Sequence, residues 1–414
     1  MFKRIQMVFI SLCLILVACS PAQEEALPTR VILPDESSAV SIAPTETQIS
    51  APTQTPAQSL LPTLPPTFTA TPTETVVPTR TPVPTLAPDL GAILFIYNDD
   101  SIIRINDDGT GQEMIITFGV GTRISDLILS PKGDIIAFVA PGNGSAREVW
   151  IANLDGTYLQ KVSCLGFSHI QHLTWSADGQ VLGFVASQAE NEPMDIYTVG
   201  WQGANECPTG NRQQLVLDRN STTFGGLAFS ADGGTLFFSD NQIYALNLTN
   251  FSVLGAFTSS IGFGADNSLA YSPSANILAY LQDTGKRMGG VPVGNLIGLN
   301  VATLDTVSNA FRDTSPVQKF VWRSDGNAVL ESLENRVVIA PIGGGTAITI
   351  TSTAGSAPNA IFSYDETRVA YLGIDANYPN IPQLFISSVT SETAPRQLTV
   401  ITEGQIGDFV WVNE

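Results

Sequence analysis

The segment GLAFSADGGTLFFS, residues 226–239, contains the pattern that decides the fold. Apolar side chains recur at Leu227 and Phe229, an Asp-Gly turn follows, and a second apolar run carries Phe238. Apolar residues at every second position indicate a β-strand, and Asp-Gly between two such runs is typical of a tight hairpin. The segment therefore predicts two antiparallel strands joined by a short turn.

The first half of this pattern occurs seven times after residue 90. All copies are apolar at their second position and carry Leu or an aromatic residue at their fourth; they are Asp126–Ser130, His172–Ser176, Gly226–Ser230, Ser268–Ser272, Lys319–Arg323, Asn359–Ser363 and Asp408–Val412. Successive copies begin 40 to 54 residues apart. Further apolar runs lie between them, such as a third strand at Val149–Leu154 and fourth strands at Gln213–Leu217 and Arg396–Ile401. Four strands in this interval are the period of a β-propeller blade.

The two ends of the repetitive region complement each other. Asp408–Val412 has no hairpin after it, whereas Ala92–Tyr97 matches the second-strand pattern and has no strand before it. One C-terminal strand plus three N-terminal strands would complete a seventh blade, and closing the ring would remove free sheet edges. The sequence thus predicts an all-β fold, a seven-bladed β-propeller over residues 91–414 that is closed in this way and preceded by a disordered tether.

These repeats resemble WD40-like β-propeller repeats of the TolB type. The resemblance rests on the motif Ser-x-Asp-Gly-x-x-[Ile/Leu]-x-[Phe/Tyr], as in Ser176–Phe184, and on a later Leu-Thr step such as Leu398-Thr399. The resemblance covers about residues 91–414. This chain differs from the TolB type in having seven repeats instead of six and no evident N-terminal α/β domain. The resemblance implies the propeller fold, while the ligand does not follow from a fold that serves many functions.

Residues 1–18 have the layout of a bacterial lipoprotein signal peptide. Lys3 and Arg4 precede the apolar run Met7–Val17, which is too short to span a bilayer as a helix. Leu16–Cys19 resembles a lipobox, so we expect lipidation at Cys19; plain secretion and a transmembrane anchor are the alternatives. The predicted location is extracytoplasmic, anchored to the cell membrane, or to the outer membrane in a cell with two membranes.

Residues 19–90 form a Pro/Thr-rich segment, exemplified by Pro78–Thr85. Proline removes backbone donors and favours extended geometry, and the segment has too few aromatic residues to build a core. We therefore expect a disordered linker that holds the folded domain away from the membrane.

The composition limits the partners. A formal net charge of −19 disfavours nucleic-acid binding and repels anionic lipid headgroups, so membrane contact is expected through the lipid anchor only. The chain has 2 His and no nucleophile-elbow or zinc-protease motif, so no catalytic residue, metal or cofactor is predicted. We expect a monomer that binds a protein or glycan; the alternative is a polysaccharide hydrolase or lyase with its site at the channel mouth.

The residues that open the innermost strands form the candidate binding rim: Asp126, His172, Ser268, Lys319, Asn359 and Asp408. They are polar next to apolar neighbours, as expected of a ligand-facing rim, and ordinary solvation of strand ends is the alternative. Asp126 and Asp408 fall in adjacent blades, where they could share a cation or serve as a carboxylate pair, although their spacing does not require either.

Other polar clusters carry weaker signals. His169 and His172 lack further ligands in metal-binding spacing. Asp107–Gly109 matches a turn of the next repeat, which favours a turn over a calcium loop. Cys164 and Cys207 are a candidate disulfide in an exported protein; their nominal positions at opposite faces oppose pairing, whereas the long Gln202–Asn211 loop would permit it.

Overall fold

Every regular element of the described residues is a β-strand. The computed structural model describes residues 91–202, 213–222, 224–255, 269–288, 291–303, 305–307, 317–333, 335–343, 345–351, 359–390 and 394–413. The prediction of an all-β fold is confirmed for these ranges. The proposed signal peptide and linker, Ser268 and Cys207 lie outside them. Within the same ranges, no helix is long and apolar enough to cross a membrane.

Four of the sheets are antiparallel meanders of four strands that are consecutive in the chain. The first contains β4 (Ser125–Leu129), β5 (Ile135–Pro141), β6 (Arg147–Asn153) and β7 (Gln160–Lys161). The second contains β8 (His169–Trp175), β9 (Val181–Ser187), β10 (Met194–Gly200) and β11 (Gln213–Ser221). The third contains β12 (Phe224–Phe229), β13 (Thr235–Asp240), β14 (Gln242–Asn247) and β15 (Val253–Leu254). The fourth contains β24 (Ala360–Phe362), β25 (Arg368–Asp375), β26 (Tyr378–Ser388) and β27 (Arg396–Gln397).

A larger sheet has eight strands because two four-strand groups share one bridge. One group contains β16 (Leu269–Tyr271), β17 (Ile277–Met288), β18 (Val291–Asn300) and β19 (Thr306–Val307). The other contains β20 (Val317–Trp322), β21 (Ala328–Leu333), β22 (Val337–Pro341) and β23 (Ile348–Thr351). A single residue pair, Gly294 with Val317, joins β18 to β20.

The remaining sheet joins the two ends of the described chain. Its order is β28 (Ile406–Val412), β1 (Ala92–Tyr97), β2 (Ser101–Asn106) and β3 (Glu113–Thr117). β28 pairs antiparallel with β1, and Phe409 lies opposite Phe95. The last strand of the sequence therefore supplies the inner strand of a sheet whose other three strands come first.

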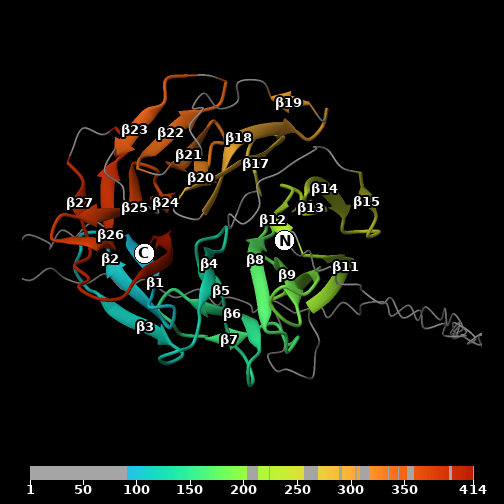
Figure 1. Ribbon diagram of the computed structural model, residues 1–414, viewed down its shortest axis with the longest axis horizontal. Helices are drawn as coiled ribbons and strands as arrows, with labels where there is room; N and C mark the ends of the chain where they lie inside the picture. Colours follow the sequence, from blue (N-terminus) through green and yellow to red (C-terminus); the bar gives the residue numbers. More distant parts are fainter. Residues whose placement is uncertain are drawn as a thin grey trace, which may run out of the picture. The chain divides into compact units, whose positions relative to one another are not determined.

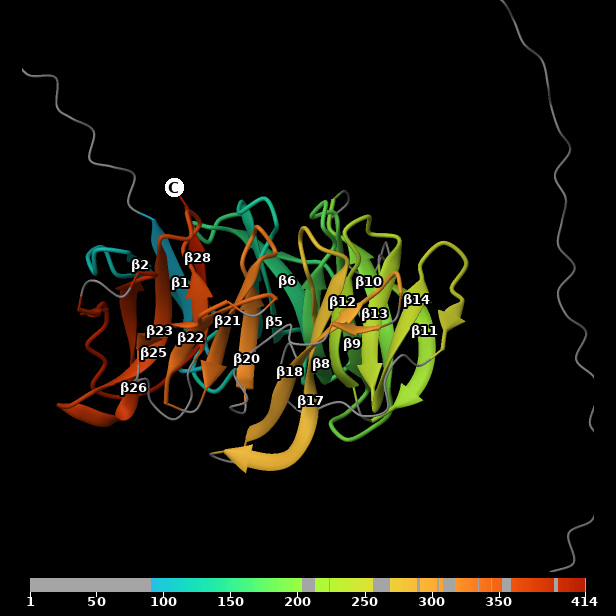
Figure 2. The same ribbon diagram turned by 90° about the horizontal axis from the view of Figure 1, so that it is seen from above.

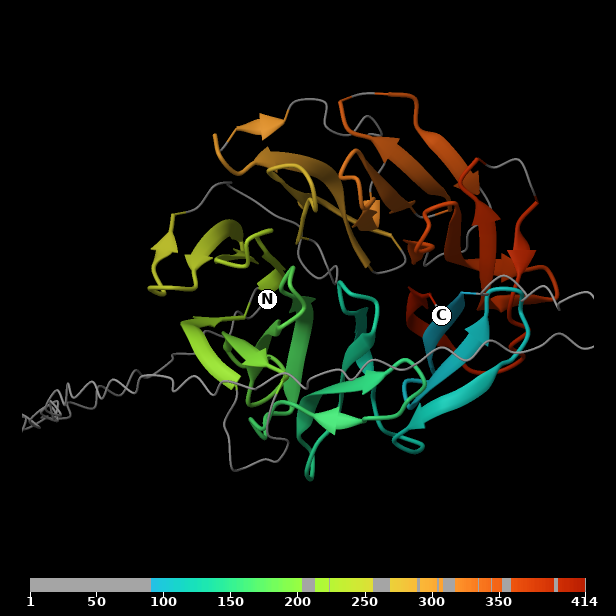
Figure 3. The ribbon, with the colours of Figure 1, turned by 180° about the vertical axis from the view of Figure 1, so that it is seen from behind.

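The sheets follow one another around a common centre, as the two opposite views in Figures 1 and 3 show. Among the inner strands, β28 contacts β4 and β24, while β8 contacts β4 and β12. The side view in Figure 2 shows the strands running roughly alongside one another, with the β17–β18 hairpin extending beyond the rest on the side away from the C-terminus.

The hydrophobic core consists of clusters between consecutive sheets. One cluster joins Val149 and Ile151 of β6 to Phe184 of β9 and Tyr197 of β10. Phe184 and Tyr197 stack with ring centroids 5.8 Å apart, and the equivalent Phe238 stacks on Tyr244 at 5.1 Å. Each sheet therefore has apolar residues on both faces, because it packs against a neighbour on each side.

The Ser-x-Asp-Gly turns are fixed by side-chain hydrogen bonds. Ser176 Oγ donates to Asp178 Oδ1 over 2.6 Å and accepts from the Val181 N–H over 2.9 Å. The Gln180 N–H donates to the same carboxylate oxygen, and Gly179 adopts a φ of +68°, which a side chain would disfavour. Ser230–Asp232 and Ser363–Asp365 repeat the hydroxyl–carboxylate bond, so the same turn bond recurs in three of the sheets.

The sheet formed by both chain ends is further fixed by a cluster around Asp107. This carboxylate is 2% exposed and lies 2.7 Å from Nη2 of Arg368 in β25. The Arg368 guanidinium also lies over the Trp411 ring, 5.0 Å from its centroid, and Arg396 donates to the Asp107 carbonyl. Residues from the N-terminal, penultimate and last repeats thus meet at one buried charge.

Replacing Asp107 with Asn should lower the free energy of unfolding by about 1–2 kcal/mol, because the half-exposed Arg368 loses its charged partner. Urea denaturation followed by tryptophan fluorescence measures this. Glu190→Gln, an exposed change in another sheet, is the control and should leave the midpoint unchanged. Equal midpoints for D107N and E190Q would contradict the assigned role of the cluster.

The aspartates of these turns should make the folding stability depend on pH. Hydrogen bonds, first from Ser176, Ser230 and Ser363, hold the pKa values of Asp178, Asp232 and Asp365 below the ordinary 3.8. A folded pKa below the unfolded one stabilises the protein at higher pH, and this stabilisation is lost as pH falls from about 3.8 through the folded value. Urea denaturation between pH 5 and pH 2 measures this loss, and Asp232→Asn should reduce it. If the free energy of unfolding falls with pH equally in the native chain and in Asp232→Asn, the turn hydrogen bonds do not have the assigned role.

Candidate functional site

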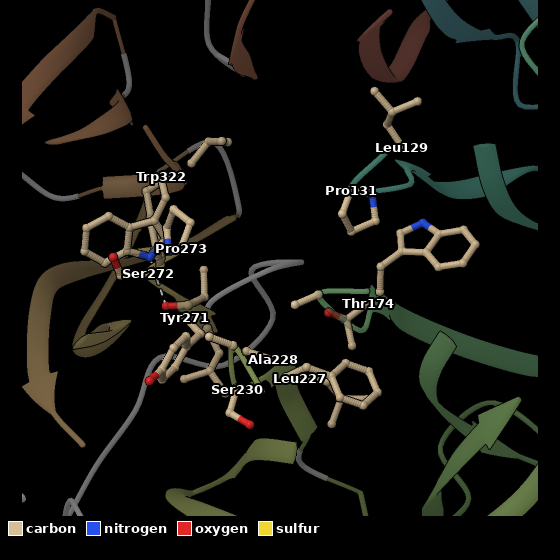
Figure 4. Close-up of a pocket in the computed structure, with 18 of the residues that line it drawn as sticks. Leu129, Pro131, Thr174, Leu227, Ala228, Ser230, Tyr271, Ser272, Pro273 and Trp322 are labelled. Atoms are coloured by element: carbon tan, nitrogen blue, oxygen red, sulfur yellow. Dashed lines mark hydrogen bonds between the residues drawn. The ribbon is translucent and has the colours of Figure 1, made fainter. Parts of the chain in front are cut away.

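A hollow of about 730 Å³ lies at the end of the inner strands where the turns to the second strands begin. Its walls come from β4, β8, β12, β16 and β20 and from the residues just after them. They include five aromatic residues, which are Trp175, Phe229, Tyr271, Phe320 and Trp322. Figure 4 shows Tyr271 and Trp322 on one side of the hollow and Pro131 and Thr174 on the other, with Ala228 between the two sides. We refer to this site as the aromatic hollow.

The repeat sequence itself builds the aromatic hollow. Trp175, Phe229, Tyr271 and Trp322 all occupy the fourth position of the repeated strand, directly before the turn. Phe229 packs over Gly183 of β9, where an added Cβ would come within 3.1 Å of its ring. Trp322 is held by a 3.0 Å hydrogen bond from its Nε1 to the Ala270 carbonyl of β16. Packing between consecutive sheets therefore fixes the walls.

Most polar groups in the walls are already used within the protein. Ser230 Oγ donates to Asp232, and Ser272 Oγ accepts from the Ala275 N–H over 3.1 Å. The Tyr271 hydroxyl donates to Asn276. Trp175 differs, since its Nε1 is buried and has no hydrogen-bond partner among the described residues. The hollow thus offers mainly apolar surface to a ligand.

The predicted rim lies near the other end of the same strands, where it links neighbouring sheets. Asp126 and His172 sit at irregular points of β4 and β8 with positive φ values of 55° and 59°. Asp126 Oδ1 accepts from the His172 N–H over 2.9 Å, and the His172 ring Nε2 lies 3.2 Å from the Phe224 carbonyl of β12. Since a carbonyl only accepts, Nε2 carries the proton. These contacts connect three consecutive sheets.

The other rim residues are distributed differently. Lys319 Nζ lies 3.4 Å from Asp408 Oδ1, so this ion pair joins β20 to β28. Of the predicted rim residues that the structure describes, Lys319 alone also lines the aromatic hollow. Asn359 is half-buried before β24, and its carbonyl accepts from the Leu372 N–H. Ser268 lies outside the described residues.

No metal centre is evident in the part of the chain that the structure describes, where no group of three or more His, Cys, Asp or Glu side chains could hold an ion. Partial burial, the main cause, lowers the pKa of His169. Asp108 and Asp155 instead bind Thr110 and Thr157 of their own turns, and these hydrogen bonds lower both carboxyl pKa values. The Asp107–Gly109 segment is therefore a turn.

Cys164 is disulfide-bonded, while Cys207 lies outside the described residues, so their pairing stays a prediction. The segment around Cys164 is held by the buried Glu148, which accepts from the Leu165 and Gly166 N–H groups. The Cys164 N–H donates to Gln213 Oε1 of the next sheet over 3.2 Å.

The aromatic residues of the hollow were not predicted as a site. Their alternation with small or apolar neighbours is the strand signal itself, so the sequence assigns them to the core. Their position next to the turns, combined with the expected radial arrangement of inner strands, is the feature that could have pointed to a common site.

The repeated four-stranded antiparallel sheets and the hollow between their inner strands define a β-propeller-like protein. No protein-family model matches the chain, and no curated protein does. Among solved structures it is similar to the crystal structure of TolB from Acinetobacter baumannii, at 15% identity over 78% of this chain and 82% of that one, with a TM-score of 0.46. It is also similar to the crystal structure of the mitotic checkpoint complex, at 15% identity over 67% and 82%, with a TM-score of 0.46. At these scores the assignment rests on the strand pairings alone.

Proposed function

We propose that this protein is a lipid-anchored extracytoplasmic binding or assembly module that presents a seven-bladed propeller to a protein or glycan partner. In this proposal β28, β1, β2 and β3 form the blade that closes the ring, and the two groups of the eight-stranded sheet count as separate blades. Cys19 carries the lipid, residues 19–90 act as a spacer, and the lipid provides the membrane contact of a monomeric protein.

The aromatic hollow is the observation that carries the binding function. Its volume is within the range of ligand sites, about 300–1,000 Å³, and large apolar surfaces at such a position are typical of recognition sites. Aromatic anchors in well-packed pockets supply most of the energy in many protein interfaces.

Binding is favoured over polysaccharide cleavage by the placement of the carboxylates. The described lining of the hollow contains no Asp or Glu, whereas glycoside hydrolysis generally requires two. Asp126 accepts from a backbone N–H and Asp408 pairs with Lys319, so both have structural partners.

The full-length chain, affinity-tagged and incubated with an envelope fraction of its own host, should retain a protein or glycan saturably. The expected loss on Ala231→Trp would be about tenfold or more, because this exposed lining residue would then fill the hollow. Tyr364→Trp is the matched control, since Tyr364 holds the same turn position in another sheet, is 70% exposed and lies outside the lining. Retention of nothing by the native chain would refute the binding function.

Cys19→Ser should transfer the protein from the membrane fraction to the soluble one, because the lipid has no other attachment point in the proposed lipobox. Mass spectrometry of the native N-terminus should find a diacylated or triacylated cysteine. An unmodified N-terminus upstream of residue 19 would show that the anchor assignment is wrong.

A further inference from the structure

We infer that the aromatic hollow receives a large apolar side chain, aromatic or aliphatic, from a basic segment of a protein partner. This inference rests on the proposed binding function and narrows it from a protein or glycan to one chemical class.

The first step concerns the hydrogen-bonding capacity of the walls. A sugar presents a hydroxyl on most carbons, and each one that is buried must find a partner or pay a desolvation cost. Ser230, Ser272, Tyr271 and Trp322 use their polar atoms in bonds within the protein. An apolar side chain needs no such partners, whereas a sugar would compete with these bonds.

The second step concerns the indole of Trp175. This side chain is 9% exposed, lines the hollow, and has no hydrogen-bond partner at Nε1 among the described residues. Because this nitrogen has almost no accessible surface and the indole belongs to the core cluster with Phe184, a ligand in the hollow meets apolar surface here and no reachable donor.

The third step concerns the charge around the opening. The turns that follow the hollow-lining strands carry four exposed aspartates, which are Asp134, Asp178, Asp232 and Asp325. The same turns carry two cations, Lys132 and Arg323, and Arg323 pairs with Asp325 over 3.6 Å. Lys319 in the wall pairs with Asp408. Asp178 and Asp232 accept hydrogen bonds that favour their ionised form. Lys and Arg residues flanking an apolar anchor would therefore be attracted, and acidic flanks would be repelled.

The test uses a phage-displayed library of random peptides of about twelve residues, selected on the immobilised full-length chain, and an array of neutral and anionic glycans. We expect enrichment of an aromatic, Leu, Ile or Met residue flanked by Lys or Arg. Synthetic copies of the enriched peptide should bind about tenfold or more weakly to the Ala231→Trp chain and equally to Tyr364→Trp. Exchanging the flanking Lys and Arg for Glu should weaken binding to the native chain, and added salt should reduce binding of the basic peptide.

The outcomes separate this inference from the proposed function. If the native chain binds a glycan and Ala231→Trp abolishes that binding, the hollow is the binding site but its ligand is not a peptide. If an envelope partner is retained equally by the native and the Ala231→Trp chains, the hollow is not the binding site, although the binding function stands. Enrichment of acidic peptides, or of peptides without an apolar anchor, would overturn the inferred partner.

Discussion

The antiparallel pairing of β28 with β1 is the constraint on which the arrangement of the other sheets depends. It ties residues 406–412 to residues 92–97, about three hundred positions earlier in the chain. Without β28, the inner edge of β1 would offer unpaired backbone groups, and β4 and β24 would lose the inner strand that contacts both. The ion pair of the buried Asp107 with the half-exposed Arg368 adds a side-chain connection at the same place.

The sequence predicts the strands well where a local signal carries the information. Alternating apolar residues and Asp-Gly turns are local, so the hairpins around Ser176 and Ser230 were identified correctly, as was the pairing of the chain ends. The fourth strand expected at Arg396–Ile401 is wrong beyond Gln397. There Oε1 of the buried Gln383 accepts hydrogen bonds from the Ile401 N–H and the Thr399 hydroxyl. The alternation of apolar residues in the sequence does not indicate these contacts. In the second strands of the hairpins, Glu331 stands where other repeats carry an aromatic residue such as Phe184 or Phe238, yet it is fully buried.

The candidate site was less predictable because it depends on convergence in three dimensions. The sequence selects Asp126 and His172 for their polarity, and the structure uses them for bonds between β4, β8 and β12. The residues that form the aromatic hollow come from five inner strands and are individually indistinguishable from core residues. Among the described residues, Lys319 belongs to both sets, since it lines the hollow and pairs with Asp408. A repeat that builds the core thus also supplies the wall of the aromatic hollow.

Hydrogen–deuterium exchange of the native full-length chain tests the central pairing most directly. Amides of β1 and β28 should exchange as slowly as those of the interior strands β5 and β13, because a paired strand opens only with its sheet. Rapid exchange of both β1 and β28, with β5 and β13 still protected, would show that these two strands do not form a stable sheet and would contradict their pairing.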